Sequence, residues 1–172
     1  MIAVLLAALV LQSSAPPLAA MVPPRDDSIG IRAQQGGSEA ATTLDRMHQA
    51  ASRADGATYF DQFSTGARFI GTDASEHWDI EQFKAYAEPL FAKGQGWTYR
   101  PRDRTVIVSG DFAWFDEKLD NDAYGELRGS GLLRRQGGGE IWKIEQYVLS
   151  FAIPNDDARA VVDLIRDPAE AP

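Results

Sequence analysis

Asp116 is the carboxylate that the sequence places best for acid–base chemistry. It follows Trp114 by two residues, and residues two apart in a strand share a face. An indole nearby removes water and raises the pKa of a carboxyl group, which suits a general base. The structural alternative is an ion pair between Asp116 and Arg128 of a neighbouring strand. Both interpretations stay open, and Asp116 is the first candidate catalytic residue.

Arg128 is the first candidate for binding a polar group of a ligand. It lies among Gly125, Gly129 and Gly131, positions without side chains where a ligand or another backbone can come close. In a pocket, its planar guanidinium would hold a carboxylate or an enolate oxygen. On an outward face it would be a solvated charge.

The two histidines are weaker candidates. His77 lies with Glu76 and Trp78 in the loop before a helix, where Trp78 would form a wall or lid of a pocket. His77 is the second candidate catalytic residue, although a loop histidine is more often simply exposed. His48 shares an apolar helical stripe with Leu44 and is interpreted as a core or pocket-edge residue.

Composition excludes several kinds of chemistry. The 172 residues include no cysteine and two histidines, so the sequence predicts no thiol nucleophile, no metal site and no iron–sulfur cluster. The glycines follow no phosphate-loop or dinucleotide pattern, and we expect no cofactor. The net charge of −8 argues against a nucleic-acid partner.

The chain begins with an uncharged segment that reads as a signal peptide. Residues 1–20 are apolar and then become small and proline-containing, which predicts a periplasmic or secreted protein. The apolar run is too short to span a membrane. If translation starts at Met21, the protein is cytoplasmic instead. Residues 21–38 have the composition of a flexible linker, and residues 39–168 are expected to form one domain.

Helices come first in this domain and strands follow. Apolar spacing predicts helices at 44–51 and 79–94, the second with a capping box formed by Asp79 and Gln82 and with Pro89 inside it. The pattern then predicts strands at 97–100, 105–109, 112–119, 126–135 and 140–153, joined by turns, with a last helix from Asn155. This order is typical of an α+β fold with helices on one face of the sheet.

The closing strand has two partly apolar faces. Strict alternation places Trp142, Ile144, Gln146, Val148 and Ser150 on one face, which we expect to line a pocket. The opposite face carries Tyr147, Leu149 and Phe151. We expect this second face to pack against another subunit in a homodimer, or to be covered by the last helix.

The domain resembles the SnoaL-like family, whose members share the fold of nuclear transport factor 2. The resemblance spans about 44–166 and lies in six phrases: Phe69–Asp73, Glu76 with Trp78, Gly96-Trp97, Ala113–Glu117, Tyr124–Arg128 and Trp142–Asn155. It implies a cone formed by a strongly curved, antiparallel or mixed sheet with helices in its concave face. Enzymes of this family place an acid or base deep in the cone, and Asp116 is the residue here that matches in kind.

These observations predict a protein that binds a small, largely apolar molecule in the cone. The first alternative is a cofactor-free isomerase, cyclase or hydrolase using Asp116 or His77, and the second is a non-catalytic association module. The candidate ligand-binding residues, expected to line the cone, are Trp78, Tyr86, Trp114, Arg128, Trp142 and Gln146.

Overall fold

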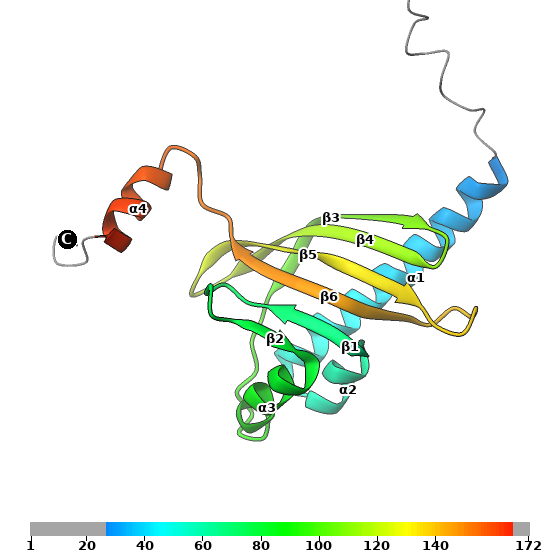
Figure 1. Ribbon diagram of the computed structural model, residues 1–172, viewed down its shortest axis with the longest axis horizontal. Helices are drawn as coiled ribbons and strands as arrows, with labels where there is room; N and C mark the ends of the chain where they lie inside the picture. The colour runs from blue at the N-terminus through cyan, green and yellow to red at the C-terminus, as the bar shows by residue number, and fades with distance from the viewer. Residues whose placement is uncertain (1–26, 167–172) are drawn as a thin grey trace, which may run out of the picture.

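The computed structural model describes residues 27–166, and it has the expected α+β architecture: a curved sheet with three helices against one face (Figure 1). The predicted signal peptide lies outside the described residues. The sheet is open and mixed, with strand order β2-β1-β6-β5-β4-β3. Its strands are β1 (Phe63–Ile70), β2 (His77–Asp79), β3 (Arg100–Ser109), β4 (Phe112–Asn121), β5 (Gly125–Arg135) and β6 (Trp142–Phe151).

Four consecutive strands form an antiparallel meander from β3 to β6. Gly110, Gly125, Gly137 and Gly138 have positive φ in or beside its three turns, which favours glycine there. β1 then pairs with β6 in parallel, and this pair makes the sheet mixed. The predicted strands at 97–100 and 105–109 are one strand, β3, which begins at Arg100, and residues 97–99 are not in a strand.

Helix α1 (Asp27–Ser52) includes the predicted helix at 44–51 but begins much earlier. Its first turns occupy residues 27–38, which we predicted to be a linker. No proline follows Pro24 before the end of the helix. Extending a helix that packing has already nucleated costs far less than starting one, so a weak sequence can continue it.

Two shorter helices complete the layer below the sheet. These are α2 (Gly56–Asp61) and α3 (Ile80–Phe91). The predicted capping box of α3 is confirmed, because Asp79 accepts from the Gln82 backbone and Gln82 accepts from the Asp79 backbone. Pro89 lies in the last turn of α3, three residues before its C-cap.

The core lies between the helices and the inner face of the sheet. The predicted stripe of α1 is buried there, with Leu44, Met47 and Ala51 at most 2 % exposed. From the sheet, Phe115, Leu119 and other buried residues face them: Ala113, Leu127, Leu133, Ile144, Tyr147 and Leu149.

The alternation of inward-facing and outward-facing residues in β6 is interrupted partway along the strand. The predicted orientation of the side chains is therefore wrong for the second half of β6. The pairing of β6 with β5 shifts register between the partners of Leu132 and Leu133, which is a β-bulge around Glu145. Trp142 and Ile144 point inward as predicted, but beyond the bulge Tyr147 and Leu149 are the buried residues. Tyr147 and Leu149 therefore belong to the core of their own chain, and they are not available to a second subunit.

Helix α4 (Ala158–Arg166) stands clear of the sheet and the other helices (Figure 1). It begins three residues after the predicted Asn155, because residues 155–157 form a turn. None of its side chains is buried. The alternative in which the last helix covers the closing strand is therefore wrong.

Among residues 27–166, no helix combines the length and the apolar character that a membrane crossing requires.

Candidate functional site

The most unusual group inside the cone is a buried carboxylate, Glu117 of β4. Its exposed fraction is 0 %, and it accepts hydrogen bonds from three side chains on three other elements. His48 Nε2 of α1 lies 2.7 Å from Oε1, and the Tyr147 hydroxyl of β6 lies 2.9 Å from the same oxygen. Arg104 Nε of β3 lies 2.6 Å from Oε2. Because an ionised carboxylate only accepts, the Nε2 atom of His48 must carry a proton.

Backbone irregularities bring these groups together. The pairing of β3 with β4 shifts register between Arg102 and Thr105, and Asp103 has a positive φ of 49° in this bulge. The bulge brings Arg104 to the inner face, where it also contacts Asp45 of α1 at 2.6 Å. On β5, Gly129 leaves room for the Tyr147 hydroxyl and for Glu117, since a Cβ there would overlap both.

The partners of Glu117 fix its charge. Burial raises the pKa of this carboxyl group, but the hydrogen bonds and charges of His48 and Arg104 outweigh burial and hold its pKa below the ordinary value. Burial and the neighbouring Glu117 charge raise the pKa of Tyr147 well above its ordinary value, so it stays protonated and donates. The network is thus a carboxylate held by a phenol, an imidazole and a guanidinium.

A column of stacked aromatic rings connects this network to the surface. Tyr147 stacks on Phe69 with centroids 5.7 Å apart, and Phe69 stacks on Phe83 at 3.9 Å. Phe83 stacks on Trp78 at 5.5 Å, and Trp78 stacks on Tyr86 at 5.0 Å. Tyr86 is 52 % exposed, so the column runs from solvent to the buried carboxylate.

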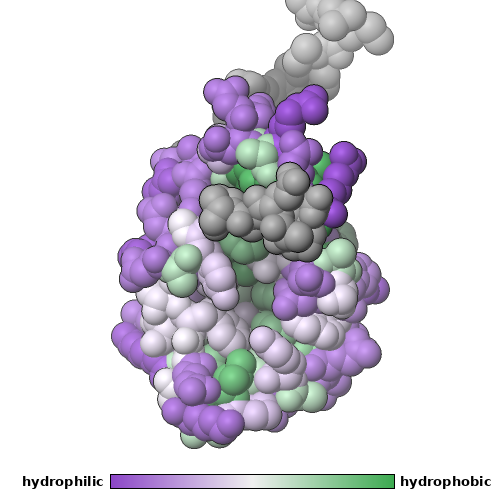
Figure 2. Space-filling model, turned by 90° about the vertical axis from the view of Figure 1, so that its left-hand side faces the viewer, coloured by the Kyte–Doolittle hydropathy of each residue, from purple (hydrophilic) through white to green (hydrophobic). Residues whose placement is uncertain are grey.

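The exposed end of this column belongs to the open end of the cone, which we call the mouth. Tyr124 and Phe151 contact each other there with centroids 5.8 Å apart and are 59 % and 45 % exposed. Tyr99 lies near both Tyr124 and Tyr86. Burial, and then the nearby Tyr124, Glu76 and Tyr86, raise the pKa of its hydroxyl. Figure 2 views this end of the molecule, with apolar residues in a central hollow and hydrophilic residues around them.

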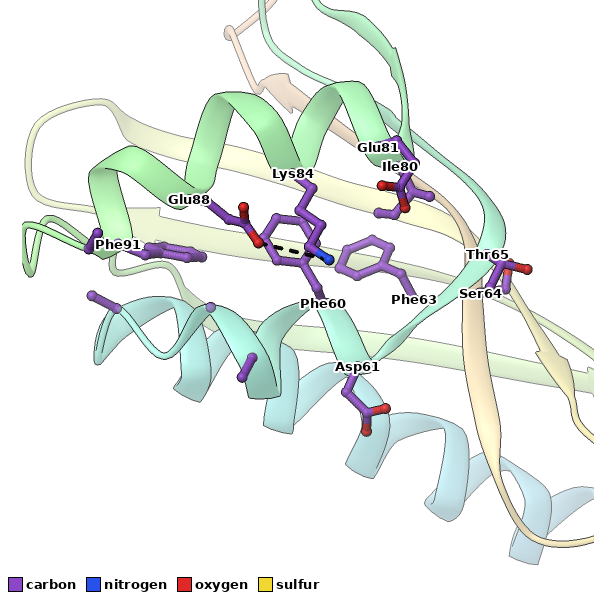
Figure 3. Close-up of a pocket in the computed structure, with 14 residues that line it drawn as sticks. Phe60, Asp61, Phe63, Ser64, Thr65, Ile80, Glu81, Lys84, Glu88 and Phe91 are labelled. Carbon is purple, nitrogen blue, oxygen red and sulfur yellow. Dashed lines mark ion pairs between the residues drawn. The ribbon is translucent and has the colours of Figure 1, made fainter.

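A separate groove of ≈ 890 Å³ lies between α2 and α3 (Figure 3). Phe60, Phe63 and Phe91 line it, and Lys84 and Glu88 reach toward each other from α3, 3.8 Å apart. None of the residues around it belongs to the Glu117 network or to the mouth. The groove has no set of converging polar side chains comparable to the Glu117 network. We therefore take the Glu117 network, together with the mouth, as the candidate site.

Both predicted catalytic residues lie outside the cone. Asp116 is exposed on the outer face of the sheet, opposite Ser130, and it does not form the alternative ion pair with Arg128. The predicted alternation of β4 is correct, but the face that carries Glu117 turns inward in place of the face that carries Asp116. His77 is exposed on β2 and bonds through Nδ1 to Arg68.

The predicted ligand-binding residues separate into two groups. Trp78 and Tyr86 lie together in the aromatic column at the mouth, where a ligand can reach them. The other four are elsewhere: Trp114, Arg128 and Gln146 on the outer face, and Trp142 buried beneath Arg135, whose guanidinium lies 4.9 Å from its ring.

Sequence reasoning missed Glu117, Arg104 and Tyr147 as a group. A usable signal was present, because Glu117 is the only charged residue in the alternating row Ala113, Phe115, Glu117 and Leu119. A carboxylate in an apolar row requires partners, and His48 stands equally alone in the apolar stripe of α1. The interpretation of His48 as a core residue is confirmed, since it is 6 % exposed.

In the described part of the chain, no three histidine or acidic side chains are grouped in a way that could hold a metal ion.

Comparison with known proteins agrees with this architecture. A model of the SnoaL-like domain matches residues 40–154. No functionally curated protein matches the chain.

Solved structures with the same fold come from several bacteria. An NTF2-like protein of unknown function from Pseudomonas putida KT2440 superposes with a TM-score of 0.58 at 18 % identity, covering 70 % of this chain and 89 % of its own. A candidate dehydratase of the NTF2-like family from Streptomyces avermitilis gives 0.60 at 13 % identity, covering 70 % and 99 %. A candidate ketosteroid isomerase from Shewanella frigidimarina NCIMB 400 gives 0.55 at 16 % identity, covering 67 % and 97 %. At these identities the likeness concerns the fold alone.

Proposed function

Because the chain belongs to the SnoaL-like domain family, we propose that it uses the cone of this fold to bind a small, largely apolar molecule at the mouth. The aromatic column carries this proposal. Tyr86, Tyr124 and Phe151 expose ring surface at one end of the molecule, and burying such rings against a ligand is favourable. Ligand sites are typically apolar hollows with a few fixed polar groups, and the Tyr147–Glu117–His48 network lies at the inner end of the column.

The test is calorimetric titration with 2-naphthol, an uncharged aromatic probe. Tyr86→Ala and Tyr124→Ala should each weaken binding roughly two- to tenfold, the effect of losing one aromatic contact of about 0.5–1.5 kcal/mol. Ile141→Ala is the matched control, because Ile141 is 62 % exposed but lies in the β5–β6 connection, at the opposite end of β5 from the β4–β5 turn that holds Tyr124. Equal affinity in the parent chain and both tyrosine variants would refute a ligand site at the mouth.

The Glu117 network supports a second candidate, acid–base catalysis without a cofactor. Here His48 would transfer the proton, while Glu117, held ionised, fixes the orientation of the imidazole by accepting from Nε2. His48 Nδ1 has no hydrogen-bond partner among the described side chains and backbone, which leaves that nitrogen available for proton transfer. The test is deuterium exchange next to the carbonyl of 2-indanone, followed by NMR. Exchange that is accelerated by the protein and lost in His48→Gln supports catalysis, and exchange at the uncatalysed rate contradicts it.

We also propose that two copies associate through the outer face of the sheet. The residues that support this differ from those predicted, because the bulge in β6 turns Tyr147 and Leu149 inward. On the outer face, Ile107, Phe112 and Trp114 are each 46 % exposed, an apolar surface unusual for a monomer. Light scattering should give a dimer mass that falls to a monomer mass in Trp114→Lys, and a monomer mass for the unaltered chain would contradict association.

Export remains a proposal supported by the apolar leader at residues 1–20. Mass spectrometry of protein recovered from a periplasmic fraction would test it. A cleaved N-terminus near Ala20 is the expected result, and full-length protein confined to the cytoplasm is the contrary one.

A further inference from the structure

The mouth contains a carboxylate that has no cationic partner. Glu76 immediately precedes β2 and is half-buried. Its side chain packs against Gly71, where a Cβ would overlap it, and its Oε2 accepts from the backbone amide of Asp73 at 3.2 Å. Within residues 27–166, no basic side chain lies within ion-pair distance of Glu76. Its negative charge is therefore held in place and left uncompensated.

The basic residues that adjoin the mouth have partners elsewhere. Arg100, at the start of β3, forms an ion pair with Asp122. Arg68 of β1 donates to His77 Nδ1. A histidine nitrogen that accepts a hydrogen bond carries no proton, so His77 is uncharged in this contact. Neither the two arginines nor the imidazole therefore supplies the positive charge that Glu76 lacks.

Aromatic side chains surround this carboxylate. Trp78 follows Glu76 by two residues, and Tyr86 stacks on Trp78 with centroids 5.0 Å apart. Burial raises the pKa of Tyr99, and the nearby Tyr124, Glu76 and Tyr86 raise it further. Charge interactions weaken with distance, so the carboxylate and these phenols lie close together. The rings of Tyr86 and Tyr124 are 52 % and 59 % exposed, at the hollow that Figure 2 shows.

Exposed aromatic faces beside an unpaired carboxylate favour an organic cation. The face of an aromatic ring is electrostatically negative and attracts a cation that lies within about 6 Å of its centroid. Glu76 adds a full negative charge, which attracts the same ligand and repels an anion. A trialkylammonium group suits such a site better than a primary ammonium group does. The primary group is strongly hydrated, so it loses more free energy when it leaves water for a surface of rings.

We propose that the ligand of the mouth is a small organic cation, an apolar molecule whose trialkylammonium group lies against Tyr86 and Tyr124 and faces Glu76. This inference rests on the proposed ligand site at the mouth and names the class of its ligand. Phe151 contacts Tyr124 with centroids 5.8 Å apart and extends the ring surface for the apolar part of the molecule. Binding compensates the charge of Glu76 and covers the exposed rings in one step.

The test compares two probes of the same shape, choline and 3,3-dimethylbutan-1-ol, which differ in one atom: a charged nitrogen in place of a neutral carbon. In calorimetric titration of the full chain, choline should bind about tenfold more tightly than the alcohol. Glu76→Gln keeps an oxygen acceptor for the Asp73 amide and removes the charge. It should weaken choline binding roughly five- to tenfold and leave the affinity for the alcohol within about twofold.

Glu81→Gln is the matched control for net charge. Glu81 is exposed on α3 and lines the groove between α2 and α3, outside the mouth (Figure 3). This variant loses the same charge as Glu76→Gln, so any general attraction of cations to a chain of net charge −8 falls equally in both. Its affinity for choline should stay within about twofold of the parent.

A second variant tests the rings without touching the carboxylate. Tyr124→Leu keeps an apolar side chain and loses the ring, so it should weaken choline binding roughly three- to tenfold and affect the alcohol less. Tyr124 is 59 % exposed, so folding does not confound this result. Unchanged choline affinity in Tyr124→Leu would overturn the inference.

The outcomes separate this inference from the proposed function. If 2-naphthol binds at the mouth but choline binds no more tightly than the alcohol, the ligand site holds and the cation inference fails. The inference also fails if Glu76→Gln and Glu81→Gln weaken choline binding equally. If neither choline, the alcohol nor 2-naphthol binds, the ligand site and the cation inference fail together.

Discussion

Two adjacent carboxylates, Asp116 and Glu117, meet opposite environments on the two faces of β4. Asp116 is exposed on the outer face and has no ion-pair partner in the described part of the chain. Glu117 is fully buried and accepts from His48, Tyr147 and Arg104. An exposed carboxylate is stabilised by water wherever it points, whereas a buried one depends on fixed donors. The comparison predicts that substitutions on the inner face of β4 change stability and chemistry more than substitutions on its outer face.

The largest expected effect is that of Glu117→Gln. Removing the negative charge leaves the mostly buried Arg104 without its inner partner, and breaking a buried ion pair costs about 3–5 kcal/mol. Asp116→Asn, one residue away, should change the free energy of unfolding by no more than about 0.5 kcal/mol. Urea denaturation of both variants measures the difference. Similar losses in the two variants would show that burial does not distinguish these residues energetically.

A smaller loss is expected for Gly129→Ala. The new methyl group would overlap the Tyr147 hydroxyl and Glu117, and such overpacking costs about 1–3 kcal/mol. In a Tyr147→Phe background the hydroxyl is absent, so the same substitution should cost less. A double-mutant cycle by urea denaturation measures this coupling. Additive effects would mean that the glycine does not make room for the hydroxyl.

The pH dependence of stability should reveal the inner carboxylate, Glu117. The pKa of Glu117 is lower in the folded chain than the ordinary value of 4.5. Its contribution to stability is therefore complete above that value and is lost as pH falls below it toward the lowered native pKa. The unfolding free energy of the parent chain should fall more steeply below pH 4.5 than that of Glu117→Gln. Parallel curves for Glu117→Gln and the parent would contradict the lowered pKa.

The smallest effect is expected on the exposed outer face. Arg128→Ala should leave the free energy of unfolding within about 0.5 kcal/mol, because exposed charges without fixed partners contribute little. It should also leave 2-naphthol affinity at the mouth unchanged. Calorimetry and denaturation on the same preparation check both. A tenfold loss of probe affinity would return Arg128 to the list of ligand-binding residues.

Local signals in the sequence predicted the architecture well. The stripe of Leu44, Met47 and Ala51, the capping box of Asp79 and Gln82, and the turns between strands each depend on residues close in the chain, and each is present in the structure. The alternation in β4 also placed Asp116 and Glu117 on opposite faces correctly. A two-residue period separates two sets of side chains, but it does not state which set faces the core.

The candidate site depended on interactions between distant residues. Arg104 reaches Glu117 because a bulge interrupts β3, and Tyr147 turns inward because another bulge shifts β6. Both bulges depend on pairing with neighbouring strands, which no local pattern reports.

The sequence by itself determined most of the elements, their order, the family resemblance and the charge balance, because short-range spacing and composition set these properties. Tertiary structure alone decided which face of each strand lines the cone. Glu117 could be buried only where His48, Tyr147 and Arg104 converge on it from three other elements, since a buried charge requires partners that the chain must bring from far away.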